Sequence, residues 1–202
     1  MPKVKVKRKS TRIDMTAMSD VTVLLLTFFM LTSTFVQKEP VTVATPSSVS
    51  EIKIPEINLL QVLVDKQGKI FLSLDKQKDR EEVLKAMGEE YGIEFTSEEV
   101  NKFKLANSFG VPIQQMKSFL ALSPEKQDEL LGSKGIPCDS IDNQFKSWVL
   151  HAKRQNRDLD IAIKADQSTP YPMIKGVMSS LQEIKQDRYK LITSLKTVPA
   201  DM

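Results

Sequence analysis

The stretch that decides the fold reads IDMTAMSDVTVLLLTFFMLTSTFV, from Ile13 to Val36. The sixteen residues from Val21 to Val36 carry no formal charge, but a helix of that length measures only about 24 Å, short of the roughly 30 Å hydrocarbon core of a bilayer. A helix that starts near Met15 measures about 33 Å and can cross. We therefore expect a membrane-spanning helix over residues 15–36, with Asp20 inside it.

Asp20 is the only charged residue in this expected span. A charged aspartate at the centre of a span costs about 2.5 to 3.5 kcal/mol on insertion scales, and such residues usually face protein or trapped water and carry a function. On a helical wheel, Thr16, Thr27 and Thr34 lie within about 40° of Asp20. The pattern indicates one polar stripe that faces other helices or a proton path. The alternative is that the threonines are bystanders and Asp20 only caps the helix.

Ile13–Val21 resembles the start of the ExbD/TolR family of biopolymer transport proteins, whose pattern is Ile-Asn-Val-Thr-Pro, two apolar residues and then Asp-Val. The resemblance implies a proton-channel subunit with Asp20 as the proton carrier. Two positions depart from the pattern, because Ala17 replaces the proline and Asp14 replaces the asparagine. Asp14 adds a second titratable group at the cytoplasmic mouth.

The tail over residues 1–14 is basic. Its cations are Lys3, Lys5, Lys7, Arg8, Lys9 and Arg12. Such an excess beside a span predicts a cytoplasmic N-terminus. It is explained by topology and anionic lipid, so no nucleic acid is expected as a partner. A cleaved signal peptide is the alternative, but Asp20 and the lack of an Ala-x-Ala-like site favour an uncleaved anchor.

Residues 37–56 read as an extended linker, with Pro40, Pro46 and a Ser-Ser pair. Within it, Glu51–Pro55 alternates apolar and polar residues. This unit resembles the short linker strand of the family, which implies pairing with its counterpart in a second copy of the chain.

Residues 57–202 predict an α+β domain with a small mixed sheet and helices on one face. Leu59–Asp65 and Lys69–Leu74 flank Lys66-Gln67-Gly68 and indicate a hairpin, followed by a helix over Asp79–Glu90. The expected last elements are a strand at Leu159–Asp166, a helix capped by Ser168-Thr169-Pro170, and a strand at Tyr189–Leu195. This end also resembles the family, and Asp166 is expected to be a structural turn or cap acid.

The middle of the domain, about 96–156, is longer than the family's usual connection. We expect an inserted group of short helices, with starts at Thr96 and Ser123 and an amphipathic helix within Ser140–Gln155. His151 is the single histidine and Cys138 the single cysteine. Neither has the neighbours that a metal site or a catalytic triad requires. We expect no enzyme activity and no cofactor.

Together these features predict an inner-membrane motor subunit that couples the proton gradient to transport across the outer membrane, with its C-terminal domain in the periplasm. One span cannot enclose a pore, so a multi-span partner is required. The resemblance implies an ExbB/TolQ-like channel protein, a homodimer of this chain, and a TonB- or TolA-like energy transducer. The alternatives are a TolR-like envelope-integrity subunit, an anchored scaffold without proton coupling, and a secreted soluble domain.

Overall fold

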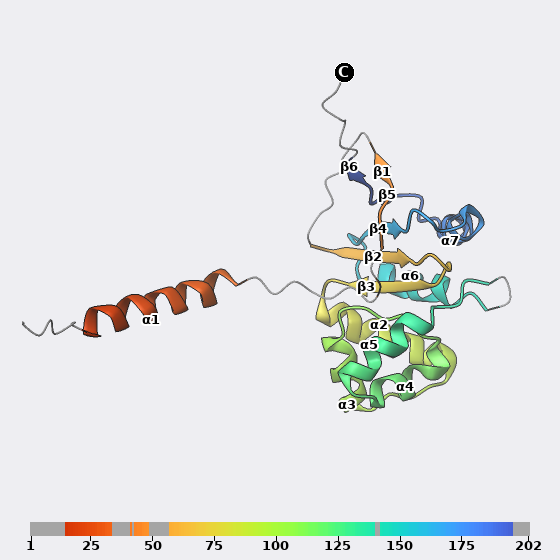
Figure 1. Ribbon diagram of the computed structural model, residues 1–202. Coiled ribbons are helices and arrows are strands. Elements are labelled where there is room, and N and C mark those ends of the chain that lie inside the picture. The colour runs from red at the N-terminus through yellow and green to blue at the C-terminus, as the bar shows by residue number, and fades with distance from the viewer. Residues whose placement is uncertain (1–14, 34–40, 42, 49–56, 140–141, 196–202) are drawn as a thin grey trace, which may run out of the picture. The chain divides into compact units, whose positions relative to one another are not determined.

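A computed structural model describes residues 15–33, 41, 43–48, 57–139 and 142–195. The chain divides into two compact units, Met1–Gln37 and Lys38–Met202, which are described separately (Figure 1). The linker unit Glu51–Pro55 lies outside the described residues.

The first unit contains one helix, α1, from Met15 to Thr32. Its 18 residues measure about 27 Å. In the described part of the chain it is the one helix long and apolar enough to cross a membrane. The helix begins at the predicted residue, and Ser33 after it is not helical. Thr34 of the predicted stripe lies outside the described residues.

The second unit is built on a four-stranded mixed sheet. Its strands are β2 Leu59–Val64, β3 Ile70–Leu74, β4 Asp160–Ala165 and β5 Tyr189–Leu191. The spatial order is β3-β2-β4-β5, and only β2 and β3 are antiparallel. The predicted hairpin is confirmed, with Gly68 at a positive φ of 79° in its turn.

Six helices belong to this unit. They are α2 Gln77–Tyr91, α3 Ser97–Leu105, α4 Ile113–Ala121, α5 Pro124–Ser133, α6 Gln144–Gln155 and α7 Tyr171–Glu183. The predicted helical middle of the chain is confirmed by α3 to α6. Thr96 and Glu99 form the expected capping box, whereas α6 is capped by the side chain of Asn143.

The helices lie on one face of the sheet, as predicted. β4 lies next to β2, and β5 lies next to β4 on the far side, so both parallel connections cross the sheet in the same direction. Right-handed crossovers that run in the same direction place their helices on the same face of the sheet. α6 contacts both α2 and α7 there. The buried side chains that the strands contribute to this face are Leu60, Val62, Val64, Ile70, Leu72, Leu74, Ile161 and Ile163.

The segment between α2 and α6, which we predict to be an insertion, covers the outer edge of β3. Leu72 and Phe109 exchange two backbone hydrogen bonds of 2.8 and 2.9 Å, and Ile136 N–H donates to the Ile70 carbonyl at 2.9 Å. Gly110 permits this approach, since a Cβ there would lie 2.0 Å from the ring of Phe71. The insertion therefore protects an edge that would otherwise be open to strand addition.

The last strand differs from the prediction. In place of one strand over Tyr189–Leu195, β5 ends at Leu191 and β6 Ser194–Leu195 pairs in parallel with β1 Ser47–Ser48 in a second, two-stranded sheet. The break falls at Ile192 and Thr193, which no glycine or proline marks in the sequence. The pairing attaches the C-terminal side of the linker to the end of the domain.

The predicted cap of α7 is also wrong. Pro170 occupies the N-cap position and no side chain caps the helix. The hydroxyl of Thr169 donates instead to the Asp65 carbonyl at 3.1 Å. Thr169 thus ties the start of α7 to the end of β2 rather than to its own helix.

Candidate functional site

Asp20 lies in the second turn of α1. Its side chain is exposed, and no hydrogen bond or ion pair links its carboxylate to any other residue that the structure describes. Within a membrane, a carboxylate without partners in its own chain must be stabilised by protonation, by water or by another protein. The carboxylate of Asp20 is therefore free to contact groups that another chain or water would supply.

The polar stripe beside Asp20 is interrupted. Because α1 is one continuous helix, Thr16 and Thr27 do lie on the same side as Asp20, but Leu24 and Leu31 share that side, at about 40° and 20°. Thr27 lies about 10 Å from Asp20 along the axis. The two side chains therefore cannot touch, and any proton path past them needs water or groups from another chain.

The hydroxyl of Thr27 has its own partner in α1. Its Oγ1 donates to the Leu24 carbonyl at 2.9 Å. Thr22 and Thr32, which are away from the Asp20 side, form the same kind of bond with the preceding turn. Thr27 can accept a hydrogen bond from a partner but gives up a bond if it donates one.

Asp166, at the end of β4, is the opposite case. It is 2% exposed, Oδ1 accepts a hydrogen bond of 2.8 Å from Ser168 N–H, and Oδ2 accepts one of 2.9 Å from Ala44 N–H. The pKa of Asp166 is lowered, first by the hydrogen bond from Ser168 and then by the bond from Ala44 and the charge of Lys66. Together these causes outweigh burial, which raises the pKa. The prediction of a structural turn acid is confirmed. Its long-range bond to Ala44 was not foreseen.

His151 belongs to a cluster between α2 and α6. Its Nε2 lies 2.5 Å from Glu90 Oε2, and Ser147 Oγ donates to Glu90 Oε1 at 2.8 Å. Burial raises the pKa of Glu90, but the hydrogen bonds from His151 and Ser147 prevail and lower it. Because Ser147 bonds the carboxylate and not the imidazole, the cluster lacks the serine–histidine contact of an activated nucleophile.

Cys138 is half-buried near α7. Burial raises the pKa of its thiol, which lies 3.4 Å from Ser180 Oγ. A raised pKa disfavours the reactive thiolate. In the residues that the structure describes, no group of three or more His, Cys, Asp or Glu side chains could hold a metal ion.

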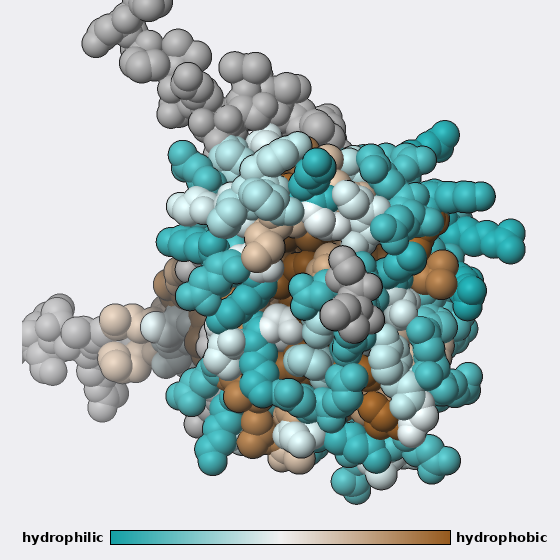
Figure 2. Space-filling model, turned by 90° about the vertical axis from the view of Figure 1, so that its right-hand side faces the viewer, coloured by the Kyte–Doolittle hydropathy of each residue, from teal (hydrophilic) through white to brown (hydrophobic). Residues whose placement is uncertain are grey.

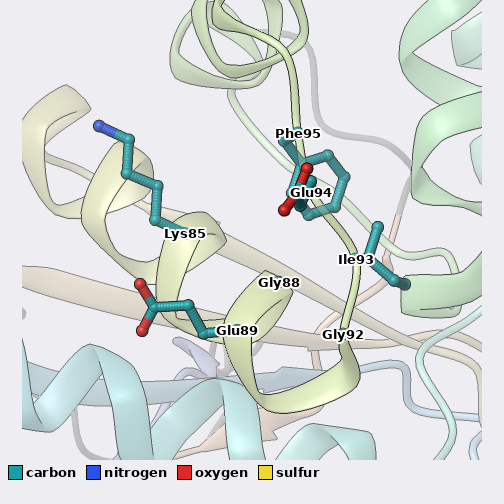
Figure 3. A pocket seen from close by; sticks show the side chains of 7 residues that line it. All are labelled: Lys85, Gly88, Glu89, Gly92, Ile93, Glu94 and Phe95. Atoms are coloured by element: carbon teal, nitrogen blue, oxygen red, sulfur yellow. The ribbon is translucent and has the colours of Figure 1, made fainter.

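A pocket of about 590 Å³ lies at the C-terminal end of α2 (Figure 3). Its lining consists of Lys85, Gly88, Glu89, Gly92, Ile93, Glu94 and Phe95. Lys85 forms an ion pair of 2.7 Å with Glu81. The lining contains no histidine, cysteine or serine, and it does not include the cluster around His151.

The comparison with protein families decides which of these features matters. The family model described as "Biopolymer transport protein ExbD/TolR" matches residues 6–196. The chain belongs to the ExbD/TolR family. Neither the curated proteins nor the solved structures gave a match.

The family match covers both α1 and the C-terminal domain, so the two belong to one kind of protein. Proteins of the ExbD/TolR family are membrane-anchored subunits of transport motors, which work in complexes with partner proteins. The single apolar helix α1 agrees with one membrane crossing. The candidate site is therefore the carboxylate of Asp20 on α1, rather than the pocket on α2.

Proposed function

We propose that this protein is the proton-carrying subunit of a bacterial inner-membrane motor. In this proposal Asp20 takes up a proton from the periplasmic side and releases it to the cytoplasmic side. The carboxylate of Asp20, with no partner among the described residues of its own chain, is the observation that carries the proposal. Thr16, Thr27 and Thr34 act as supporting polar groups along the same side.

The energies involved are of similar size. An ionised aspartate in the middle of a span costs about 2.5 to 3.5 kcal/mol, and moving one charge through the field is worth about 2.3 kcal/mol per 100 mV. The proton gradient can therefore bias the protonation state of Asp20. A change in the charge of Asp20 alters the free energy of contact between α1 and the polar surfaces of a partner.

The composition of α1 sets the kind of partner that is needed. Apart from Asp20 and a few hydroxyls, its exposed side chains are apolar on all sides. One such helix cannot form a hydrated path. We propose a multi-span ExbB/TolQ-like protein as the channel wall and a homodimer of this chain within it, with residues 1–14 in the cytoplasm.

The C-terminal domain then has a mechanical role. We propose that residues 37–56 form a periplasmic linker and that the domain over 57–202 engages a TonB- or TolA-like energy transducer. Its β1–β6 pairing and the Asp166–Ala44 bond attach the chain that arrives from the linker to the domain. Motion of the span can thereby be passed to the domain.

One observation favours a second candidate, an anchored scaffold without proton coupling. Asp20 is only about one and a half turns from the start of α1, where the partial positive charge of a helix N-terminus favours an acid. In that case Asp20 would fix the helix at the interface and carry no proton. A TolR-like envelope-integrity role is a third candidate, in which proton coupling by Asp20 is retained.

Asp20→Asn tests the proposal, because asparagine has nearly the same shape but carries no proton. We expect loss of energised transport in cells, with normal membrane insertion and normal co-purification of the partner. Thr22→Val is the matched control, since Thr22 lies on the other side of the same helix and is expected to retain transport. Normal transport by Asp20→Asn would favour the scaffold.

A further inference from the structure

The end of the C-terminal domain at which β2 and β4 finish carries an exposed apolar group. Tyr171 is 70% exposed and Met173 49% exposed, and Pro170 and Pro172 beside them are also exposed. The hydroxyl of Tyr171 forms no hydrogen bond with any described residue. These residues, together with Lys66 and Lys175, are called the Tyr171 face below.

The Tyr171 face rests on a rigid frame. Met173 packs across the β2–β3 turn so closely that a Cβ on Gly68 would lie 2.7 Å from its Cγ. The Thr169 hydroxyl ties the start of α7 to the Asp65 carbonyl. Met173 is therefore fixed against the β2–β3 turn, while about half of its surface remains exposed.

Cations border the apolar residues. Lys66 in the β2–β3 turn and Lys175 in α7 are both exposed, and neither forms an ion pair with a described residue. The β2–β3 turn and α7 lie on the right of Figure 1, so Figure 2 looks onto this end of the domain, where hydrophilic side chains cover much of the surface. Aromatic and sulfur-containing side chains beside lysines are typical of surfaces that meet a membrane interface.

The length of the chain limits how far this end of the domain can lie from a membrane that α1 crosses. Ala44 is fixed to this end of the domain, because its N–H donates to Asp166 and its carbonyl accepts a hydrogen bond from Gln167 N–H. Ala44 lies only twelve positions after Thr32, the last residue of α1. A fully extended chain of that length spans at most about 42 Å. Such a short tether raises the effective concentration of the bilayer at the Tyr171 face, so a weak contact is enough.

We propose that the Tyr171 face docks on the surface of the membrane that α1 crosses. Tyr171 and Met173 enter the headgroup region, and Lys66 and Lys175 contact lipid phosphates. A protein partner is a poorer fit, because a stable interface buries about 800 Å² on each side and this group consists of one tyrosine, one methionine and two prolines. The proposal rests on α1 as a membrane span, and it does not rest on proton transfer by Asp20.

The test uses methionine methyl groups that the chain already has. The full chain is labelled at its methionine methyl groups and placed in nanodiscs of phosphatidylcholine and phosphatidylglycerol that contain a gadolinium-chelating lipid. We expect the Met173 methyl signal to relax much faster than that of Met178 on the same helix, and the buried Met116 to be unaffected. Equal relaxation at Met173 and Met178 would overturn the proposal.

Two variants distinguish the apolar contribution to docking from the electrostatic one. Tyr171→Ser should reduce the docked population about tenfold, the scale of burying one aromatic side chain. Lys175→Gln should reduce it about fivefold in the anionic nanodiscs and have no effect in pure phosphatidylcholine. Leu105→Ser is the matched control, since Leu105 is 71% exposed but lies at the other end of the sheet, beside Arg80 and Leu74.

Two further results would contradict docking on lipid. One is loss of the Met173 effect with Leu105→Ser, and the other is a Met173 signal that changes with protein concentration, which indicates contact between copies. Asp20→Asn should leave docking unchanged. A failure of docking and a failure of proton coupling can therefore be told apart.

Discussion

Asp20 and Asp166 are the same residue type in two very different settings. Both oxygens of Asp166 accept backbone hydrogen bonds, from Ala44 and Ser168, and the side chain is almost fully buried. Asp20 is exposed on α1 and has no such bond with any residue that the structure describes. The burial and the lowered pKa of Asp166 therefore mark a structural acid, and the acid that we propose as functional is the exposed one.

The difference follows from how a carboxylate is stabilised. Hydrogen bonds to the charged form favour it, so the pKa of Asp166 is lowered and its charge is fixed at neutral pH. Asp20 receives no such help from its own chain. In our proposal the groups that act on this carboxylate come from a channel partner and not from its own chain.

Asp166→Ala is expected to have the largest effect on stability. It removes the two part-buried hydrogen bonds from the N–H groups of Ala44 and Ser168, and a bond to a charged acceptor contributes more to stability than a bond between neutral groups. We expect the unfolding temperature of the C-terminal domain to fall by about 5 °C, as measured by circular dichroism. Asp20→Ala serves as the control and should not move it, and equal shifts for both variants would contradict the contrast.

The free energy of unfolding at acid pH tests whether the charge of Asp166 stabilises the fold. Because its folded pKa is lowered, its contribution is fully present above the unfolded value of about 4. The contribution is lost as the pH falls through the folded pKa. Asp166→Asn should therefore flatten the fall in stability below pH 4 or so, as shown by urea unfolding at a series of pH values. An unchanged acid limb would mean that other carboxylates dominate it.

Thr27→Val should have the smallest effect. The hydroxyl already donates to the Leu24 carbonyl, and it is too far along α1 to touch Asp20. We expect energised transport to fall by no more than about threefold, the range of one weak neutral hydrogen bond. A loss as complete as that expected for Asp20→Asn would show that the hydroxyl is a required part of the proton path.

Local sequence signals predicted much of the fold. The start of α1 at Met15, the hairpin of β2 and β3, and the capping box at Thr96 all depend on residues that are close in the chain. Asp20 was singled out for the same reason, because a charge within an apolar run stands out.

Long-range contacts could not be predicted in this way. The bond from Ala44 to Asp166 joins residues that are 122 positions apart, and the pairing of β1 with β6 joins the linker to the end of the chain. Thr169 resembled a helix cap but found a better partner in the Asp65 carbonyl. The coverage of the β3 edge by Phe109 depends likewise on packing that no local pattern reports.

Proton flux through the complex purified from its own membranes tests the central claim most directly. The complex is reconstituted into vesicles that contain a pH-sensitive dye, in three forms: wild type, Asp20→Asn and Asp166→Asn. The account predicts that Asp20→Asn abolishes flux while the assembled Asp166→Asn complex retains it. Normal flux through the Asp20→Asn complex would contradict the assignment of Asp20 as the proton carrier.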